Sequence, residues 1–128
     1  MNKEQRAYER RIPTGYVYAA LGRDYERVGK LIDLSLGGLA FEYISNGDQT
    51  GDYSQIDIFK VGEVFNLHNL PCKIVYDIPL FQIRGNIKPS KHPQNQRCGV
   101  EFNKITQESY DQLTLFLESH TVANKVNN

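Results

Sequence analysis

Between Thr14 and Phe102 the chain is a succession of short β-type runs separated by polar turn sequences. Each run is rich in Val, Ile, Leu, Tyr or Phe, and residues 39–44 (LAFEYI) alternate apolar and polar side chains, which indicates one buried face. No crossover helices separate the runs, so we do not expect a parallel Rossmann-like sheet. The predicted strands are 15–21, 28–34, 39–44, 56–59, 63–67, 71–78, 80–88 and 97–102.

The apolar period changes towards the C-terminal end of the sequence. Thr106 is a good helix cap, and Glu108 would lie in the first turn of a helix that follows it. The residues that recur at helical spacing are Tyr110, Leu113, Phe116 and Leu117. Seven or eight short strands followed by a helix over residues 106–120 predict a mainly β fold, either a sandwich or a small barrel with the helix packed on it.

The length of 128 residues is typical of one domain with a real hydrophobic core. Residues 1–12 are charged and show no strand pattern, so they are predicted to form an N-terminal arm. Residues 13–120 are predicted to form the β domain with its helix, and residues 121–128 a disordered tail.

The net charge of the chain limits the classes of molecule that it can be expected to bind. Fifteen basic and fifteen acidic residues leave a formal net charge of zero, so the chain as a whole is not a binder of polyanions such as DNA or RNA. Residues 1–30 nevertheless hold seven Lys or Arg against four acids. A cationic N-terminal segment attracts small anions, although exposed charge often serves only solubility.

The cysteine content and the hydropathy favour a cytoplasmic protein. Cys72 and Cys98 stand among apolar residues without zinc-site spacing, which predicts buried, reduced thiols. The charged start MNKEQRAYERR does not resemble a signal peptide. No stretch approaches the roughly 18 apolar residues of a membrane helix, so we expect no membrane partner.

Motifs for catalysis are absent from the sequence. It has no nucleophile elbow, P-loop or GxGxxG motif, and its three histidines have no HxH or HxxxH relation. We therefore expect no catalytic residues, no metal site and no cofactor. The histidines are His68, His92 and His120, and the acids that would have to meet in space to form an acidic pair are Asp52, Asp57 and Asp77.

Two short motifs have complementary chemistry. EQRAYERR places Arg6 and Arg10 four residues apart, with Arg11 adjacent, and guanidinium forks bind phosphates or the O6/N7 edge of guanine. A solvated arm with weak ion pairs is the alternative for this segment.

The second motif, DLSLGG, begins with Asp33, whose carboxylate would accept the N1–H and N2–H₂ donors of guanine. Ser35 is expected on the same side of the strand as Asp33, and Gly37 and Gly38 permit close approach of a ligand to the backbone. A simple turn at the end of a strand is the alternative explanation.

In this order, Arg6-x-x-x-Arg10 and Asp33-x-Ser35-x-x-Gly38 resemble the two-part signature of PilZ domains. LIDLSLGGLAFEY resembles the second and third strands of these domains, and RCGVEF resembles their late GVxF strand. An amphipathic helix follows where the family has one. The resemblance covers about residues 4–118, most of the chain.

The resemblance implies a six-stranded antiparallel β-barrel with a C-terminal helix, which acts as a bacterial receptor for cyclic di-GMP and not as an enzyme. It implies that Arg6 and Arg10 contact guanine edges and phosphates and that Asp33 and Ser35 bind guanine. With Arg11, Gly37 and Gly38, these residues form the predicted site. The ligand would be one molecule or an intercalated pair, and closure of the flexible arm would signal to a protein partner.

Two other functions are compatible with such a chain. The first is a protein-interaction module with the same barrel and no affinity for nucleotide. The second is a single-strand nucleic-acid binder on an OB-like barrel, which the neutral overall charge disfavours.

Overall fold

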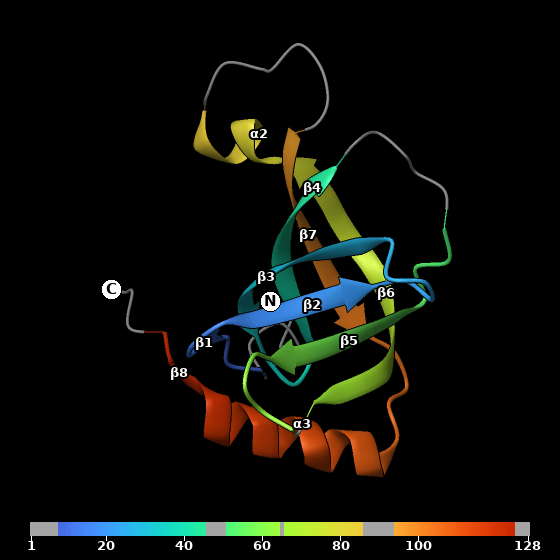
Figure 1. Cartoon of the computed structure of the whole chain (residues 1–128), viewed down its shortest axis with the longest axis vertical. Coiled ribbons are helices and arrows are strands. Elements are labelled where there is room, and N and C mark those ends of the chain that lie inside the picture. Colours follow the sequence, from blue (N-terminus) through green and yellow to red (C-terminus); the bar gives the residue numbers. More distant parts are fainter. Residues whose placement is uncertain (1–7, 46–50, 65, 86–93, 125–128) are drawn as a thin grey trace, which may run out of the picture.

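The structure, a computed structural model, describes residues 8–45, 51–64, 66–85 and 94–124. Strands and helices follow one another in chain order as Figure 1 labels them. They are β1 (Arg11–Pro13), β2 (Val17–Leu21), β3 (Arg27–Leu34), β4 (Gly38–Ser45), β5 (Gln55–Lys60), β6 (Leu67–Pro79), α2 (Leu80–Arg84), β7 (Gln94–Phe102), α3 (Gln107–His120) and β8 (Thr121–Ala123).

Six strands close into an antiparallel barrel. The order β2-β5-β6-β7-β4-β3 is completed by pairing of β2 with β3, so none of these strands is left as an open edge strand. β1 pairs with the end of β3, and β8 pairs with β1, so these two short strands form a branch outside the closed barrel. The predicted six-stranded antiparallel barrel is confirmed.

The core follows from the alternation of side chains along the strands. In β4, for example, Leu39, Phe41 and Tyr43 point inward and are at most 5% exposed, whereas Glu42 and Ile44 face outward. The helix α3 lies across one end of the barrel and contributes Leu113, Phe116 and Leu117 to the same core, whereas the short helix α2 lies at the opposite end (Figure 1).

The predicted C-terminal helix is confirmed together with its cap. The Thr106 side chain accepts a hydrogen bond from the backbone N–H of Ser109 at 3.1 Å. Glu108 lies in the first turn and His120 in the last, so both charges have the sign that the helix dipole favours when His120 is protonated.

Two predicted strands differ from the structure. The expected strand 80–88 begins as α2, because Pro79 precedes it and Gly85 ends it in a left-handed conformation; residues 86–88 lie outside the described residues. The expected strand 63–67 is irregular where described, and β6 starts only at Leu67. A turn at Gly62, with φ of 90°, precedes this irregular stretch.

The ends of the chain also differ from expectation. The predicted disordered tail 121–128 is wrong for its first three residues, which form β8 against β1; 125–128 lie outside the described residues. The predicted arm 1–12 overlaps β1, so Arg11 and Ile12 belong to the sheet. Both errors have one cause, because β1 and β8 pair with each other although they lie at opposite ends of the sequence.

A polar cluster lies inside the barrel, away from the turn between β3 and β4. Arg27 Nη1 donates to Asp77 Oδ2 at 2.5 Å, and its guanidinium lies 4.3 Å from the ring centre of Tyr53. Asp77 also accepts from the Tyr43 hydroxyl at 2.9 Å and from Gln96 Nε2 at 3.0 Å. Burial and the Asp77 carboxylate raise the pKa of Tyr43. This cluster joins β3, β4, β6 and β7.

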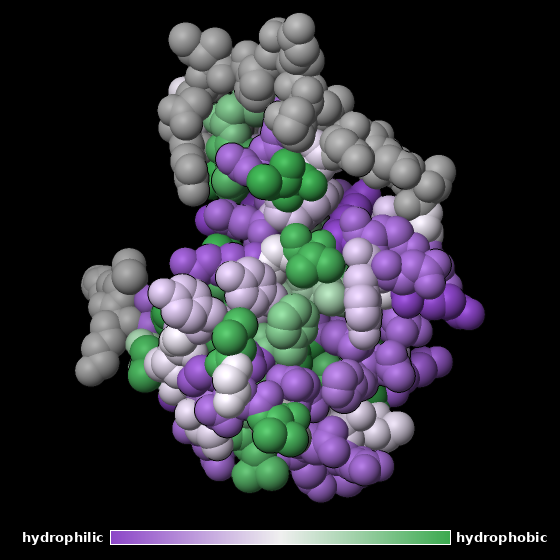
Figure 2. All heavy atoms as spheres, in the orientation of Figure 1, coloured by the Kyte–Doolittle hydropathy of each residue, from purple (hydrophilic) through white to green (hydrophobic). Residues whose placement is uncertain are grey.

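Both cysteines are buried and free, as predicted. Burial raises the pKa of the Cys72 thiol to about 11. On the outer face shown in Figure 2, hydrophobic side chains lie in small patches separated by hydrophilic ones. This face therefore does not present the broad apolar patch that marks many protein interfaces.

Candidate functional site

The DLSLGG motif forms a compact turn between β3 and β4. The backbone N–H of Ser35 donates to the carbonyl of Gly38 at 2.9 Å, and the Ser35 hydroxyl accepts from the N–H of Gly37 at 3.1 Å. The hydroxyl also lies 3.4 Å from the Gly38 carbonyl, to which it donates. Ser35 is 8% exposed, so its first role is to hold this turn together.

Close neighbours leave no room for a side chain at either glycine of the turn. A Cβ at Gly38 would lie 2.2 Å from the carbonyl oxygen of Val100 on β7. A Cβ at Gly37 would lie 2.7 Å from the ring of Tyr8, which packs against the turn. The Gly37 carbonyl accepts from the N–H of Phe102 at 2.9 Å. The glycines thus let β7 and the segment before β1 approach the turn.

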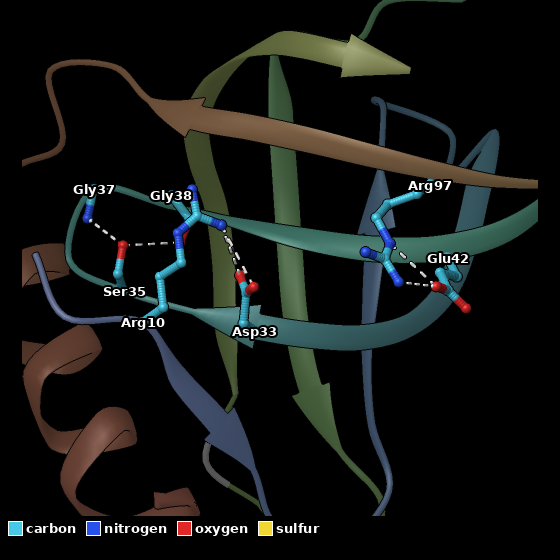
Figure 3. Close-up of polar contacts among 7 residues, drawn as sticks. All are labelled: Arg10, Asp33, Ser35, Gly37, Gly38, Glu42 and Arg97. Carbon is cyan, nitrogen blue, oxygen red and sulfur yellow. Dashed lines mark hydrogen bonds and ion pairs between the residues drawn. The ribbon is translucent and has the colours of Figure 1, made fainter. Parts of the chain in front are cut away.

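Asp33 faces outward one residue before the end of β3, beside Arg10. The register between β3 and β4 shifts between Leu31 and Asp33, which marks a bulge that sets the direction of the following side chains. Arg10 Nη1 lies 3.4 Å from both oxygens of the Asp33 carboxylate (Figure 3). The Arg10 side chain is 65% exposed and that of Asp33 18%. These long contacts at the surface make a weak ion pair.

A groove of about 730 Å³ lies beside this pair and the turn. Its rim includes Tyr8 and Arg10, and the turn residues form one wall. Cross-strand register places Asp33, Ala40, Gly99 and Tyr76 in one row across β3, β4, β7 and β6. Ala40 and Gly99, in the middle of the row, have a small side chain or none, and the Gly99 position accommodates the ring of Tyr76.

Tyr76 forms the end of the row away from Asp33. A Cβ at Gly99 would lie 2.2 Å from the Tyr76 ring, so the ring lies directly on the glycine backbone. Burial and the negative charge of Asp33 raise the pKa of the Tyr76 hydroxyl, which therefore remains neutral at pH 7. Together with Tyr8 and Tyr110, it gives the groove an aromatic lining.

A second arginine–carboxylate pair lies further along the same outer face (Figure 3). Arg97 on β7 donates to the Glu42 carboxylate on β4 through Nε at 3.1 Å and Nη2 at 2.5 Å. Three residues of this face were not predicted from the sequence: Arg97, Glu42 and Tyr76. The alternation in RCGVEF could have placed Arg97 on the face of Gly99, but no local pattern reveals which residues oppose it on β4 and β6.

The predicted site residues fall into three groups. Arg10 and Asp33 are brought together beside the turn that contains Ser35, Gly37 and Gly38. Arg11 points elsewhere and donates from Nε to the Thr121 hydroxyl at 2.8 Å. Arg6 lies outside the described residues.

The three aspartates considered for an acidic pair lie in separate networks. Asp57 binds Tyr25, His68 and Asn69; Asp77 belongs to the Arg27 cluster; Asp52 binds Arg23 and Ser54. His68 is exposed beside Asp57, His120 Nδ1 lies 3.4 Å from Lys60 Nζ, and His92 falls outside the described residues. Within the described ranges, no cluster of His, Cys, Asp or Glu fits a metal ion.

Fold and site together define a small closed β-barrel domain with a groove on its outer face, edged by an arginine–aspartate pair and a glycine-containing turn. The chain belongs to the PilZ domain family, because the family model for the PilZ domain matches residues 4–119. In the part of the chain that the structure describes, no helix is long and apolar enough to cross a membrane.

Two solved structures share the fold. One is the crystal structure of YcgR from Escherichia coli in complex with c-di-GMP, with a TM-score of 0.59 and 18% identity; the match covers 90% of this chain and 45% of that chain. The other is the PilZ domain of Escherichia coli YcgR with c-di-GMP, with a TM-score of 0.59, 16% identity and 90% coverage of both chains. This chain thus spans less than half of the first structure. No match was found among curated proteins.

Proposed function

We propose that this chain is a receptor domain for cyclic di-GMP and not an enzyme. Membership in the PilZ family and the c-di-GMP named for both YcgR structures support this ligand. The observation that carries the proposal is the loose Arg10–Asp33 pair, whose arginine is exposed and lines the groove. These two side chains supply the donor and the acceptor that a guanine nucleotide requires.

The chemistry of the ligand matches both members of the pair. The Asp33 carboxylate would accept hydrogen bonds from N1–H and N2–H₂ of guanine, and the Arg10 guanidinium would bind a phosphate or the O6/N7 edge. Because the contacts between them are long and mostly exposed, the pair can separate and bind the ligand at little cost. Arg6, four residues before Arg10, would supply a second guanidinium.

The turn and the aromatic side chains would complete the site. Gly37 and Gly38 keep the backbone accessible, and Ser35 would bind guanine through the oxygen that now holds the turn. Binding would order the segment around Arg6 and Arg10 and so change the surface that a protein partner recognises. We place this receptor in the bacterial cytoplasm, where it would act in signal transduction.

Calorimetric titration of the chain with cyclic di-GMP tests the proposal. We expect saturable binding in the wild type and a loss of affinity of roughly tenfold or more in Asp33→Ala, because one charge-assisted contact is removed. Asp52→Ala is the matched control, since Asp52 also pairs with an exposed arginine, Arg23, at 3.3 Å. Absence of heat with the wild type at tens of micromolar nucleotide would refute the proposal.

A second candidate is a PilZ-like interaction module without nucleotide affinity. It is favoured by the observation that Asp33 and Ser35 already have partners within the protein. A pull-down that recovers the same protein partner with and without cyclic di-GMP, together with a null calorimetric result, would establish this alternative.

A further inference from the structure

Arg10 and Arg11 are consecutive, yet their side chains bind opposite sides of the N-terminal segment. Arg10 faces Asp33 on β3, whereas Arg11 Nε donates to the Thr121 hydroxyl at 2.8 Å and Nη2 to the Thr121 carbonyl at 3.4 Å. This arrangement follows from extended backbone, in which successive side chains alternate in direction. Glu9 also contacts Arg11 at 3.7 Å, on the side away from the groove.

Thr121 is a firm attachment point for Arg11. It is 6% exposed and forms the C-cap of α3, and its hydroxyl donates to the Leu117 carbonyl in the last turn of that helix. Arg11, Thr121 and Leu117 therefore form a continuous hydrogen-bond chain. A guanidinium beside the C-terminal end of a helix is further favoured by the helix dipole.

The position of β1 depends mainly on this attachment. β1 pairs with β3 at a single position, Arg11 opposite Leu34, but with β8 along all three of its residues. Just after β1, the N–H of Thr14 donates to the carbonyl of His120 at 2.9 Å. β1, which directly follows Arg10 and begins at Arg11, thus has most of its ladder pairings with the C-terminal strand.

Register matters here because a shift by one residue reverses the faces of a strand. If β1 moved by one residue along β8, the side of β1 that now carries Arg10 would carry Arg11, and Arg10 would point towards Thr121. The Arg11–Thr121 contact makes the observed register specific, since it matches a guanidinium with a buried hydroxyl and a carbonyl.

We propose that Arg11 is a positioning residue, which fixes β1 against β8 so that Arg10 faces the groove, and that it does not contact the ligand. This inference rests on the proposed function, because it assigns Arg11 its part in nucleotide binding. It follows that ligand binding in the groove would be coupled, through β1, to β8 and to the C-terminal end of α3.

The test compares Arg11→Ala, Thr121→Val and the double variant by calorimetry with cyclic di-GMP. We expect each single change to weaken binding by roughly three- to tenfold, and the double variant to bind no more weakly than the worse single variant, because both break the same contact. Thr121→Ser retains the hydroxyl and is expected to bind like the wild type. Arg23→Ala, an exposed arginine on a distant loop, is the control for loss of positive charge.

The alternative of direct contact between Arg11 and the ligand predicts a different pattern. Thr121→Val would then leave affinity unchanged or increase it, because Arg11 would be released, and only Arg11→Ala would weaken binding. That result would overturn the inference.

A second measurement does not depend on the ligand. In the nucleotide-free protein, amide hydrogen exchange at Val122 and Ala123 should be faster in Arg11→Ala and Thr121→Val than in the wild type and in Thr121→Ser. Unchanged exchange in both variants would overturn the inference even if the wild type binds. If both variants exchange faster but the wild type binds no nucleotide, the proposed function is refuted, while the attachment of β1 through Arg11 and Thr121 stands.

Discussion

Two arginine–aspartate pairs each connect β3 to another part of the chain, and they differ in the distance between the partners and in their exposure to solvent. Arg10 and Asp33 lie 3.4 Å apart at the surface, with the arginine side chain 65% exposed. Arg27 and Asp77 lie 2.5 Å apart inside the barrel, with side chains 5% and 16% exposed. The same two residue types therefore serve two purposes in one small domain.

The difference lies in how many other groups hold each pair. Asp77 also accepts from Tyr43 and Gln96, and the Arg27 guanidinium lies against the Tyr53 ring, so exchange of either partner would leave buried polar atoms unsatisfied. Arg10 lines a groove that is open to solvent, and Asp33 lies beside Arg10. The first pair stabilises the fold, and we propose that the second binds the ligand.

The largest expected effect comes from Asp77→Ala. This change leaves the Arg27 charge buried without the carboxylate that neutralises it, and we expect the free energy of unfolding to fall by about 3–5 kcal/mol. Denaturant unfolding measures this loss. Asp52→Ala, which breaks an exposed pair, should change stability by less than about 1 kcal/mol. Equal stability of the two variants would contradict the distinction between the pairs.

Tyr43→Phe tests the same cluster with a smaller change. It removes only the hydroxyl that donates to Asp77 at 2.9 Å, and we expect a loss of about 1.5–3 kcal/mol in the free energy of unfolding. Tyr16→Phe is the control, because the Tyr16 side chain is 70% exposed. If both substitutions are neutral, the hydroxyl of Tyr43 does not support the buried pair.

Arg10→Ala is expected to act on binding and not on stability. We expect affinity for cyclic di-GMP to fall roughly tenfold or more, while the free energy of unfolding changes by less than about 1 kcal/mol. Calorimetry and denaturant unfolding on the same sample separate the two effects. Arg23→Ala removes an equally exposed arginine, paired with Asp52 at 3.3 Å, and should leave both quantities unchanged. A large loss of stability in Arg10→Ala would show that this pair is structural.

The smallest effect concerns Asp57, a buried carboxylate that accepts hydrogen bonds from Tyr25, His68 and Asn69. Burial opposes ionisation, but hydrogen bonds from the Asn69 N–H, Tyr25 and His68 outweigh it and lower the pKa of Asp57 below its ordinary value of 3.8. Because the pKa is lower in the folded protein, this stabilisation is fully present from about pH 5 upwards and is lost progressively as the pH falls towards the folded value.

Comparison of Asp57→Asn with the wild type measures this dependence. The difference in the free energy of unfolding should be largest near pH 5 and should narrow progressively as the pH falls below it. If the difference in the free energy of unfolding stays constant down to the lowest pH measured, ionisation of the Asp57 carboxylate does not provide the stabilisation.

The regular part of the fold could be predicted because its signals are local. β-type composition in residues 28–34 and 97–102 and alternation in residues 39–44 indicated three strands of the barrel, and Thr106 indicated the start of α3. The helix α2 was missed because five residues are too few for a helical period to emerge from an apolar run. β1 and β8 were missed because each depends on a partner at the other end of the sequence.

The candidate site was predicted only as far as its local motifs extend. DLSLGG indicated the turn, and the arginine motif indicated that Arg10 and Asp33 belong to the same candidate site. Which arginine faces the groove was not predictable, because it depends on the pairing of β1 with β8. The row from Asp33 to Tyr76 was likewise hidden, since it follows from the register of four strands and from a bulge in β6.

The branch formed by β1 and β8 has a mechanical consequence. The barrel strands form a closed circuit, in which movement of one strand must break hydrogen bonds with neighbours on both sides. β1 and β8 lie outside that circuit and can move while every ladder of the barrel stays intact. The Arg27 cluster makes the barrel stiffer still at its other end. A domain built in this way can respond at one edge while the rest of it serves as a fixed frame.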